Sequence, residues 1–211
     1  MDIEQFKTLP LLCILRGITK DQTGPVTRGA IHSGLKAIEV TMNTEGATSL
    51  ISEMKQNSGD AIAIGAGTVL NKDDTKKALD AGASFIVSPI TSHEVIDYCL
   101  SKKVPVFPGA MTPQEVYRAW DAGATMVKVF PAKNLGPSYC KELKGPFSQI
   151  SLLACGGITV DNINDWFQNG TDAIAFGGIT HLKGDTLTEQ MSTFETYLTK
   201  LITTYLKAKK D

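Results

Sequence analysis

The sequence contains few of the residues that build metal centres or disulfides. Its three histidines stand far apart without metal-ligand spacing, and its four cysteines form no CxxC pair. Cys13, Cys99 and Cys155 lie in apolar surroundings, as expected of buried, reduced thiols in the cytoplasm. We therefore predict a cytoplasmic protein with no metal site and no other cofactor.

The sequence also lacks an excess of one charge and a long apolar run. Its 21 basic and 22 acidic side chains give a formal net charge of −1, so we expect no nucleic-acid or membrane partner. Polar or charged residues interrupt every apolar run well short of a membrane span. The acidic start, residues 1–6, lacks the basic-then-apolar pattern of a signal peptide. The sequence thus indicates a globular protein whose partner is a small-molecule substrate.

What the sequence does contain is a regular alternation of short apolar runs and helical segments. The eight runs predict strands at residues 11–15, 36–41, 61–66, 85–87, 104–107, 126–132, 150–153 and 173–176. The segments between them predict helices, and residues 2–8 predict a short leading helix. Glycines end several of these helices at intervals of 41 to 48 residues, namely Gly34, Gly82, Gly123 and Gly170.

Strands that alternate with helices, without a linker rich in proline or polar residues, predict one α/β domain over residues 1–211. We predict a closed (β/α)8 TIM barrel with a short N-terminal helix; an open doubly wound sheet is the alternative. The barrel is favoured because chemically active residue types end many of the strands, and only a barrel brings them to one mouth. These residues are Arg16, Glu39, Thr68, Pro89, Lys128, Gly156 and Gly177.

Side-chain alternation predicts that one lysine and one glutamate point into the barrel. Successive strand residues face opposite sides, so Lys128 lies on the opposite face from Val127 and Val129. Glu39 is likewise flanked by two β-branched residues. If the β-branched residues pack under helices, the amine and the carboxylate both face the interior.

An inward amine beside an inward carboxylate is typical of imine chemistry. Burial favours the neutral amine, which can attack a ketone, and the resulting iminium accepts electrons when a neighbouring carbon–carbon bond breaks. A carboxylate can then take and return protons. The alternative interpretation of Lys128 and Glu39 is a purely structural salt bridge.

Two glycine pairs follow the last two predicted strands. Gly156-Gly157 and Gly177-Gly178 occupy the positions where many barrels bind phosphate through backbone N–H groups. The alternative is that these glycines merely turn the chain. Arg16, at the end of the first strand, is a candidate partner for a carboxylate or phosphate, or else a surface arginine on a loop. A phosphate-binding isomerase therefore remains a second enzyme hypothesis.

Seven motifs, in order, resemble those of the KDPG/KHG aldolases, which act on 2-keto-3-deoxy-6-phosphogluconate and 4-hydroxy-2-oxoglutarate. They are Ile38-Glu39-Val40-Thr41, residues 65–70 (GAGTVL), Ser88-Pro89, Pro108-Gly109, residues 128–132 (KVFPA), Gly145-Pro146-Phe147 and Gly156-Gly157-Ile158.

The resemblance implies a class I aldolase that releases pyruvate and is assembled as a homotrimer. It implies that Lys128 forms the Schiff base and that Glu39 is the general acid/base. It also implies that Thr68, Pro89 and Phe130 line the pyruvate pocket.

The departures from the family pattern concern the distal end of the substrate. Asn43 stands where many gluconate-type members have arginine, Cys155 where they have threonine, and Ile179 where they have serine. Arg16 and Asn43 resemble the branch that acts on 2-keto-3-deoxy-6-phosphogalactonate. Cys155 and Ile179 replace two hydroxyl donors, which predicts only a shallow preference for phosphorylated substrates. An aldolase for a non-phosphorylated 2-keto-3-deoxy acid is the alternative.

Overall fold

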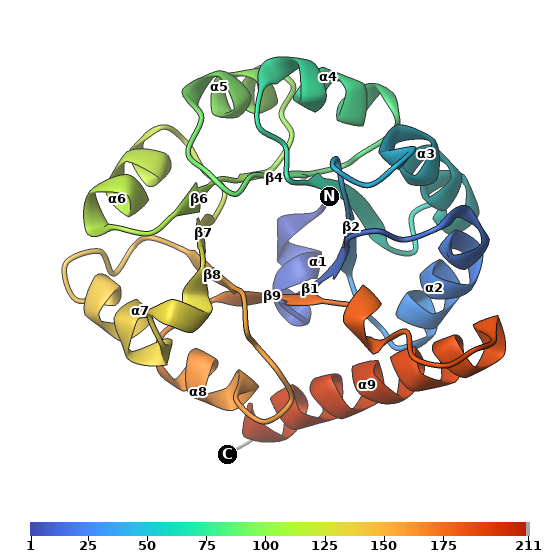
Figure 1. The fold of residues 1–211 in the computed structure, drawn as a ribbon. Coiled ribbons are helices and arrows are strands. Elements are labelled where there is room, and N and C mark those ends of the chain that lie inside the picture. Colours follow the sequence, from blue (N-terminus) through green and yellow to red (C-terminus); the bar gives the residue numbers. More distant parts are fainter. Residues whose placement is uncertain (210–211) are drawn as a thin grey trace.

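The computed structural model describes residues 1–209, which form a ring of parallel strands surrounded by helices (Figure 1). Neighbouring strands follow the order β5-β4-β3-β2-β1-β9-β8-β7-β6 in one sheet. The strands are β1 (Leu11–Leu15), β2 (Ala37–Thr41), β3 (Ala63–Gly67), β4 (Ile86–Val87), β5 (Val106–Phe107), β6 (Gly109–Ala110), β7 (Val127–Val129), β8 (Leu152–Cys155) and β9 (Ala173–Gly177).

A short helix, α1 (Ile3–Thr8), precedes the first strand. Later helices follow the strands and cover the outside of the ring; they are α2 (Lys20–His32), α3 (Ala47–Ser58), α4 (Lys72–Asp80), α5 (His93–Ser101), α6 (Pro113–Asp121), α7 (Pro137–Lys144), α8 (Ile163–Gln168) and α9 (Leu187–Ala208), with 3₁₀ turns η1 (Ala132–Asn134) and η2 (Ile179–His181). Within residues 1–209, no helix is long and apolar enough to cross a membrane.

The ring closes at Pro108, which follows the strand predicted at residues 104–107 and separates β5 from β6. Proline has no N–H to donate, yet its carbonyl accepts a hydrogen bond from the Lys128 N–H at 2.8 Å. On either side, the Thr125 N–H donates to Val106 O and the Phe130 N–H to Ala110 O. The predicted (β/α)8 barrel is therefore confirmed, with its fifth strand split in two, and the open doubly wound sheet is wrong.

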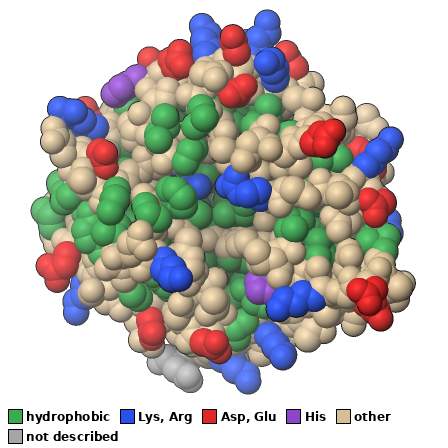
Figure 2. Space-filling view, in the orientation of Figure 1, with side chains coloured by type: hydrophobic (Ala, Val, Ile, Leu, Met, Phe, Trp, Pro, Cys, Tyr) green, Lys and Arg blue, Asp and Glu red, His purple; other side chains and the backbone are tan. Residues whose placement is uncertain are grey.

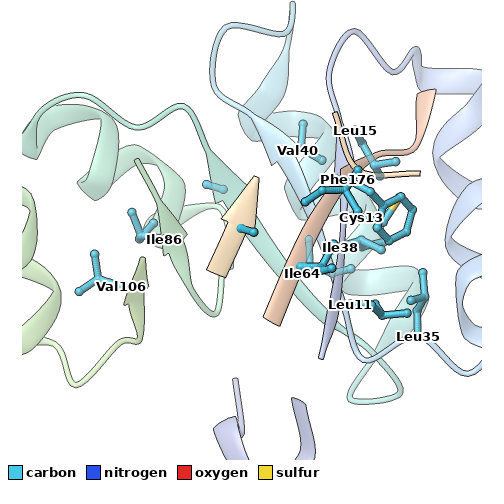
Figure 3. Packing of buried hydrophobic residues seen from close by; sticks show 14 of the residues in the cluster. Leu11, Cys13, Leu15, Leu35, Ile38, Val40, Ile64, Ile86, Val106 and Phe176 are labelled. Atoms are coloured by element: carbon cyan, nitrogen blue, oxygen red, sulfur yellow. The ribbon is translucent and has the colours of Figure 1, made fainter. Parts of the chain in front are cut away.

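The two faces of the strands bury different apolar clusters. The outer cluster lies between strands and helices; Figure 3 shows part of it, with Cys13 of β1 beside Phe176 of β9. The inner cluster fills the barrel and includes Leu12, Phe85 and Phe107. Phe6 of α1 closes its lower end, with its ring 6.3 Å from that of Phe107. Helix α1 accordingly lies behind the strands in Figure 1, which leaves the opposite mouth open.

Small residues on β3 make room for larger side chains inside the barrel. A Cβ at Gly65 would overlap the ring of Phe85, and a Cβ at Gly67 would overlap the carboxylate of Glu39. Glycine is required at both positions because the neighbouring side chain occupies that volume. On the inner face of the barrel, β3 thus contributes almost no side-chain volume. The Phe85 ring and the Glu39 carboxylate occupy the space beside it.

Local signals explain how the chain reaches each strand. The glycines predicted to end helices, Gly34, Gly82, Gly123 and Gly170, all have a positive φ, between 84° and 98°. The start of α6 is a capping box, in which the Thr112 hydroxyl accepts from the Glu115 N–H while Glu115 Oε2 accepts from the Thr112 N–H at 2.8 Å. These helix ends are therefore fixed by local sequence and not by the residues around the barrel mouth.

Candidate active site

A cavity of about 390 Å³ opens at the mouth where the strands end. Its wall contains six residues predicted from the sequence as chemically active strand ends: Arg16, Thr68, Pro89, Lys128, Gly156 and Gly177. The predicted residues Phe130 and Gly157 also line it. Residues far apart in the chain therefore converge on one space, as the barrel topology requires.

The Lys128 side chain lies on the inner face of β7. Its neighbours Val127 and Val129 belong to the outer apolar cluster, whereas Met126 belongs to the inner one. Lys128 is only 6% exposed, and its Nζ lies 5.0 Å from the ring centroid of Phe130. The alternation that predicted an inward lysine is therefore present, and the amine reaches the cavity with little hydration.

Glu39 lies on the inner face of β2, 1% exposed and set back from the cavity wall. Burial raises the pKa of the Glu39 carboxyl from its ordinary value of 4.5 to about 7, although the positive charges of Lys128 and Arg16 act in the opposite direction. Its Oε2 is buried without a hydrogen-bond partner among the described residues. A carboxyl with this pKa exchanges its proton readily near neutral pH.

Lys128 and Glu39 are coupled electrostatically but do not form an ion pair. Among residues 1–209, ion pairs join Lys7 to Glu4, Lys55 to Asp60 and Lys144 to Asp172, and none joins Lys128 to Glu39. Nevertheless, the charge of Lys128 lowers the pKa of Glu39. The alternative interpretation, a structural salt bridge between Lys128 and Glu39, is therefore wrong. Both side chains remain available to a third group, such as a substrate.

Arg16 is held at the mouth by two side chains from neighbouring strand ends. Its Nη1 donates to Asn43 Oδ1 at 2.8 Å and its Nη2 to Thr68 Oγ1 at 3.3 Å. Thr68 has a φ of 56°, in the left-handed region that threonine rarely adopts. Asn43 does not line the cavity itself, but its contact with Arg16 ties it to the site. The three residues thus act as one polar unit.

The glycine pairs contribute unequally. Gly156, Gly157 and Gly177 line the cavity, whereas Gly178 does not. The Gly178 N–H already donates to Ile14 O at 2.8 Å, and a Cβ at Gly178 would overlap the buried Sγ of Cys13. The prediction that Gly178 offers a free N–H to an anion is corrected accordingly: its N–H joins β9 to β1.

The cavity wall also contains residues that were not predicted as site residues. These are Ile14, Cys155, Ile158, Ala175, Phe176, Ile179 and Thr180. Cys155 and Ile179 had been identified only as departures from the family pattern. Burial raises the pKa of the Cys155 thiol above its ordinary range, so the group stays neutral. The strand alternation that predicted Lys128 and Glu39 does not single out the remaining residues of this set, because most of them are apolar.

Acidic side chains are scarce at the centre of this face. Figure 2 shows basic side chains both around the central hollow and at the edge, whereas the acidic side chains lie mostly toward the edge. Arg16 and Lys128 are basic residues of the cavity wall, which contains no Asp or Glu. A wall of this composition attracts an anionic ligand.

The family model described as "KDPG and KHG aldolase" matches residues 3–192 of this sequence. The chain belongs to this family of aldolases. Among curated relatives, the 2-dehydro-3-deoxy-6-phosphogalactonate aldolase of Escherichia coli K12 is 34% identical over 85% of this chain and 88% of its own. The 2-dehydro-3-deoxy-phosphogluconate aldolase of Treponema pallidum is 32% identical over 83% and 82%.

The fold agrees with that family. A solved structure described as native KDPGal superposes with a TM-score of 0.89 at 31% identity, over 96% of this chain and 97% of the other. The predicted family resemblance is therefore confirmed, and with it the prediction that the chain is an aldolase, hence a lyase.

Proposed function

We propose that this aldolase cleaves a 2-keto-3-deoxy sugar acid through an imine on Lys128. The neutral amine attacks the C2 ketone and water leaves, so that an iminium forms. Glu39 accepts the proton of the C4 hydroxyl, the C3–C4 bond breaks, and its electron pair enters the iminium to give an enamine. The aldehyde departs. The same carboxyl then returns a proton to C3, and hydrolysis of the imine releases pyruvate and free Lys128.

The observation that carries this proposal is that two buried ionisable side chains, Lys128 and Glu39, lie near one cavity without an ion pair between them. A lysine 6% exposed and a glutamate 1% exposed are costly to bury, and no mutual ion pair offsets the cost. Groups maintained in this condition are typical of proton transfer and nucleophilic catalysis. Because Glu39 is set back from the cavity, we expect protons to pass between Glu39 and the reacting carbon through the substrate hydroxyl or a bridging water.

The pyruvate end of the substrate is assigned to one side of the cavity. Thr68, Pro89 and Phe130 lie with Lys128 in the wall, and Arg16 supplies a fixed guanidinium for a carboxylate. Gly156, Gly157 and Gly177 then bind the distal group. We propose gluconate- or galactonate-type 2-keto-3-deoxy-6-phospho acids as substrates, with 4-hydroxy-2-oxoglutarate as a smaller one. The aldehyde product is glyceraldehyde 3-phosphate or glyoxylate.

A non-phosphorylated 2-keto-3-deoxy acid is the second candidate substrate. It is favoured by Cys155 and Ile179, which bring a weak donor and no donor to the cavity wall. It is disfavoured by the basic character of the mouth, which suits a second anionic group.

We propose that the aldolase works as a homotrimer in the cytoplasm. Beside the active-site cavity lies a cleft of about 410 Å³ that shares Pro89 and Phe130 with it. Large apolar side chains near this cleft are unusually exposed, among them Ile90 (50%), Met111 (41%) and Tyr117 (47%). An apolar patch of this kind supports contact with another copy of the chain. The four free, buried cysteines suit a reducing compartment.

Pyruvate with borohydride tests the proposed chemistry directly. Reduction of the imine should add the pyruvate carbon skeleton to Lys128, detectable by peptide mass, and the full reaction should release pyruvate from a 2-keto-3-deoxy-6-phospho acid. Trapping at another lysine, or no trapping with an active substrate panel, would reject the assignment of Lys128.

A further inference from the structure

A second lysine, which does not itself line the cavity, packs its stem on the glycine loop that does. Lys133 belongs to η1, the turn that follows β7 and Pro131. A Cβ built on Gly157 would lie 2.7, 2.8 and 3.0 Å from the Cβ, Cγ and Cδ of Lys133. The aliphatic part of Lys133 therefore covers the Cα of Gly157, and the amine is two bonds beyond the last of these atoms.

The loop under Lys133 is held in place by hydrogen bonds to Asn162. The Asn162 side-chain amide donates to Gly157 O at 3.0 Å, and the Thr159 N–H donates to Asn162 Oδ1 at 2.9 Å. On the other side, a Cβ at Gly156 would lie 3.6 Å from Ala132 N. The backbone of the loop thus lies against that of η1, which keeps the Lys133 stem beside Gly157.

The Lys133 amine has no intramolecular partner. Within residues 1–209 it takes part in no hydrogen bond, ion pair or cation–π contact, and its side chain is exposed. The two cations that line the cavity already have proposed roles. Arg16 is assigned to the substrate carboxylate, and Lys128 must be neutral to form the proposed imine. An anion bound at the glycine loop thus has one uncommitted cation beside it.

We infer that Lys133 binds the distal anionic group of the substrate and makes this aldolase selective for phosphorylated 2-keto-3-deoxy acids. This inference depends on the proposed function. The ammonium pairs with phosphate oxygens that the Gly156 and Gly157 backbone also faces. Cys155 and Ile179 alone predict only a shallow preference for phosphorylated acids, because neither supplies a hydroxyl donor. The positive charge of Lys133 adds an attraction for phosphate and turns this into a strong preference.

The charge of Lys133 can be removed without removing its packing. Lys133→Met keeps an unbranched stem over Gly157, Lys133→Arg keeps the charge, and Lys76→Met on the outer helix α4 is the matched control. The measurement is kcat/KM for a 2-keto-3-deoxy acid with and without its 6-phosphate. Inhibition by inorganic phosphate is measured alongside.

We expect Lys133→Met to lose about ten-fold in kcat/KM with the phosphorylated acid and almost nothing with the other, because the pair is charged but partly exposed to solvent. The inhibition constant for phosphate should rise by a similar factor, and the rate should depend less on salt. Lys133→Arg should retain the selectivity, and Lys76→Met should match the wild type. Trapping of pyruvate at Lys128 should be unchanged, since pyruvate has no distal group.

Two outcomes would overturn the inference while leaving the aldolase intact. One is an equal loss with both acids in Lys133→Met, which would indicate a structural role for the stem. The other is unchanged selectivity. If the wild type neither traps pyruvate nor cleaves either acid, the proposed function fails first and this inference fails with it.

Discussion

The carboxylate of Glu39 on β2 packs directly against the Cα of Gly67 on β3, and even a methyl group at position 67 would overlap Oε1. The two residues lie on adjacent strands, where Glu39 pairs in register with Gly65. The position of the proposed proton-transfer group is therefore set by the absence of a side chain on the next strand. This relationship can be tested without altering Glu39 itself.

Gly67→Ala should displace the Glu39 carboxylate and reduce kcat roughly 10²-fold, since a shift of about 1 Å in a reacting group can have that effect. Gly67 does not have a positive φ, so alanine is compatible with its backbone. Steady-state kinetics would measure the loss. Gly24→Ala, on helix α2 against the flexible Arg28 side chain, should remain fully active. Wild-type kcat in Gly67→Ala would show that the packing does not position the carboxylate.

Lys128→Met should leave the fold intact and abolish cleavage. Methionine fills a similar volume on the inner face of β7, whereas the imine can no longer form. The measurements are thermal unfolding and pyruvate release. Borohydride should label Lys133→Met, because the neighbouring lysine is not the nucleophile, but not Lys128→Met. Residual turnover well above background in Lys128→Met would contradict the mechanism.

Glu39 should control exchange of the pyruvate methyl protons with solvent. Because the pKa of Glu39 is raised to about 7, the ionised base accumulates as pH rises through 7, and the exchange rate should rise with it. Glu39→Gln should lower the rate by about 10²–10⁴ and remove this pH dependence, as measured by NMR. Glu45→Gln, an exposed carboxylate after the same strand, should keep both. A midpoint near 7 that persists in Glu39→Gln would assign it to another group.

The same pKa makes a prediction about stability. The folded protein retains the Glu39 proton up to about pH 7, whereas the unfolded chain releases it near 4.5, so the folded state loses stability as pH rises between these values. Glu39→Gln cannot ionise. Relative to the wild type, it should gain at most about 3 kcal/mol between pH 5 and pH 8.

Urea unfolding of both proteins at pH 5 and pH 8 would measure that gain, and the ΔG of unfolding of Glu45→Gln should follow the wild type at both. A constant difference between Glu39→Gln and the wild type across this range would mean that burial does not raise the pKa in solution.

Much of this protein was determined by local sequence. Alternating apolar and polar residues placed Lys128 and Glu39 on the inner faces of their strands, because a strand repeats every two residues. The glycine after each of several helices set where the next strand begins, because only glycine adopts the left-handed backbone easily. These elements predicted a parallel α/β domain, and the chemically active residue types at many strand ends favoured a closed barrel over an open sheet.

Tertiary structure decided which groups are free and which are engaged. Gly177 and Gly178 look alike in sequence, but the Gly178 N–H is bonded to Ile14, a residue 164 positions away (178 − 14). The bond from Arg16 to Asn43 spans 27 positions, and the contact of Lys133 with Gly157 joins two separate strand ends. Hydrogen bonds and van der Waals contacts of this kind depend on positions to within an ångström, and local periodicity carries no such information.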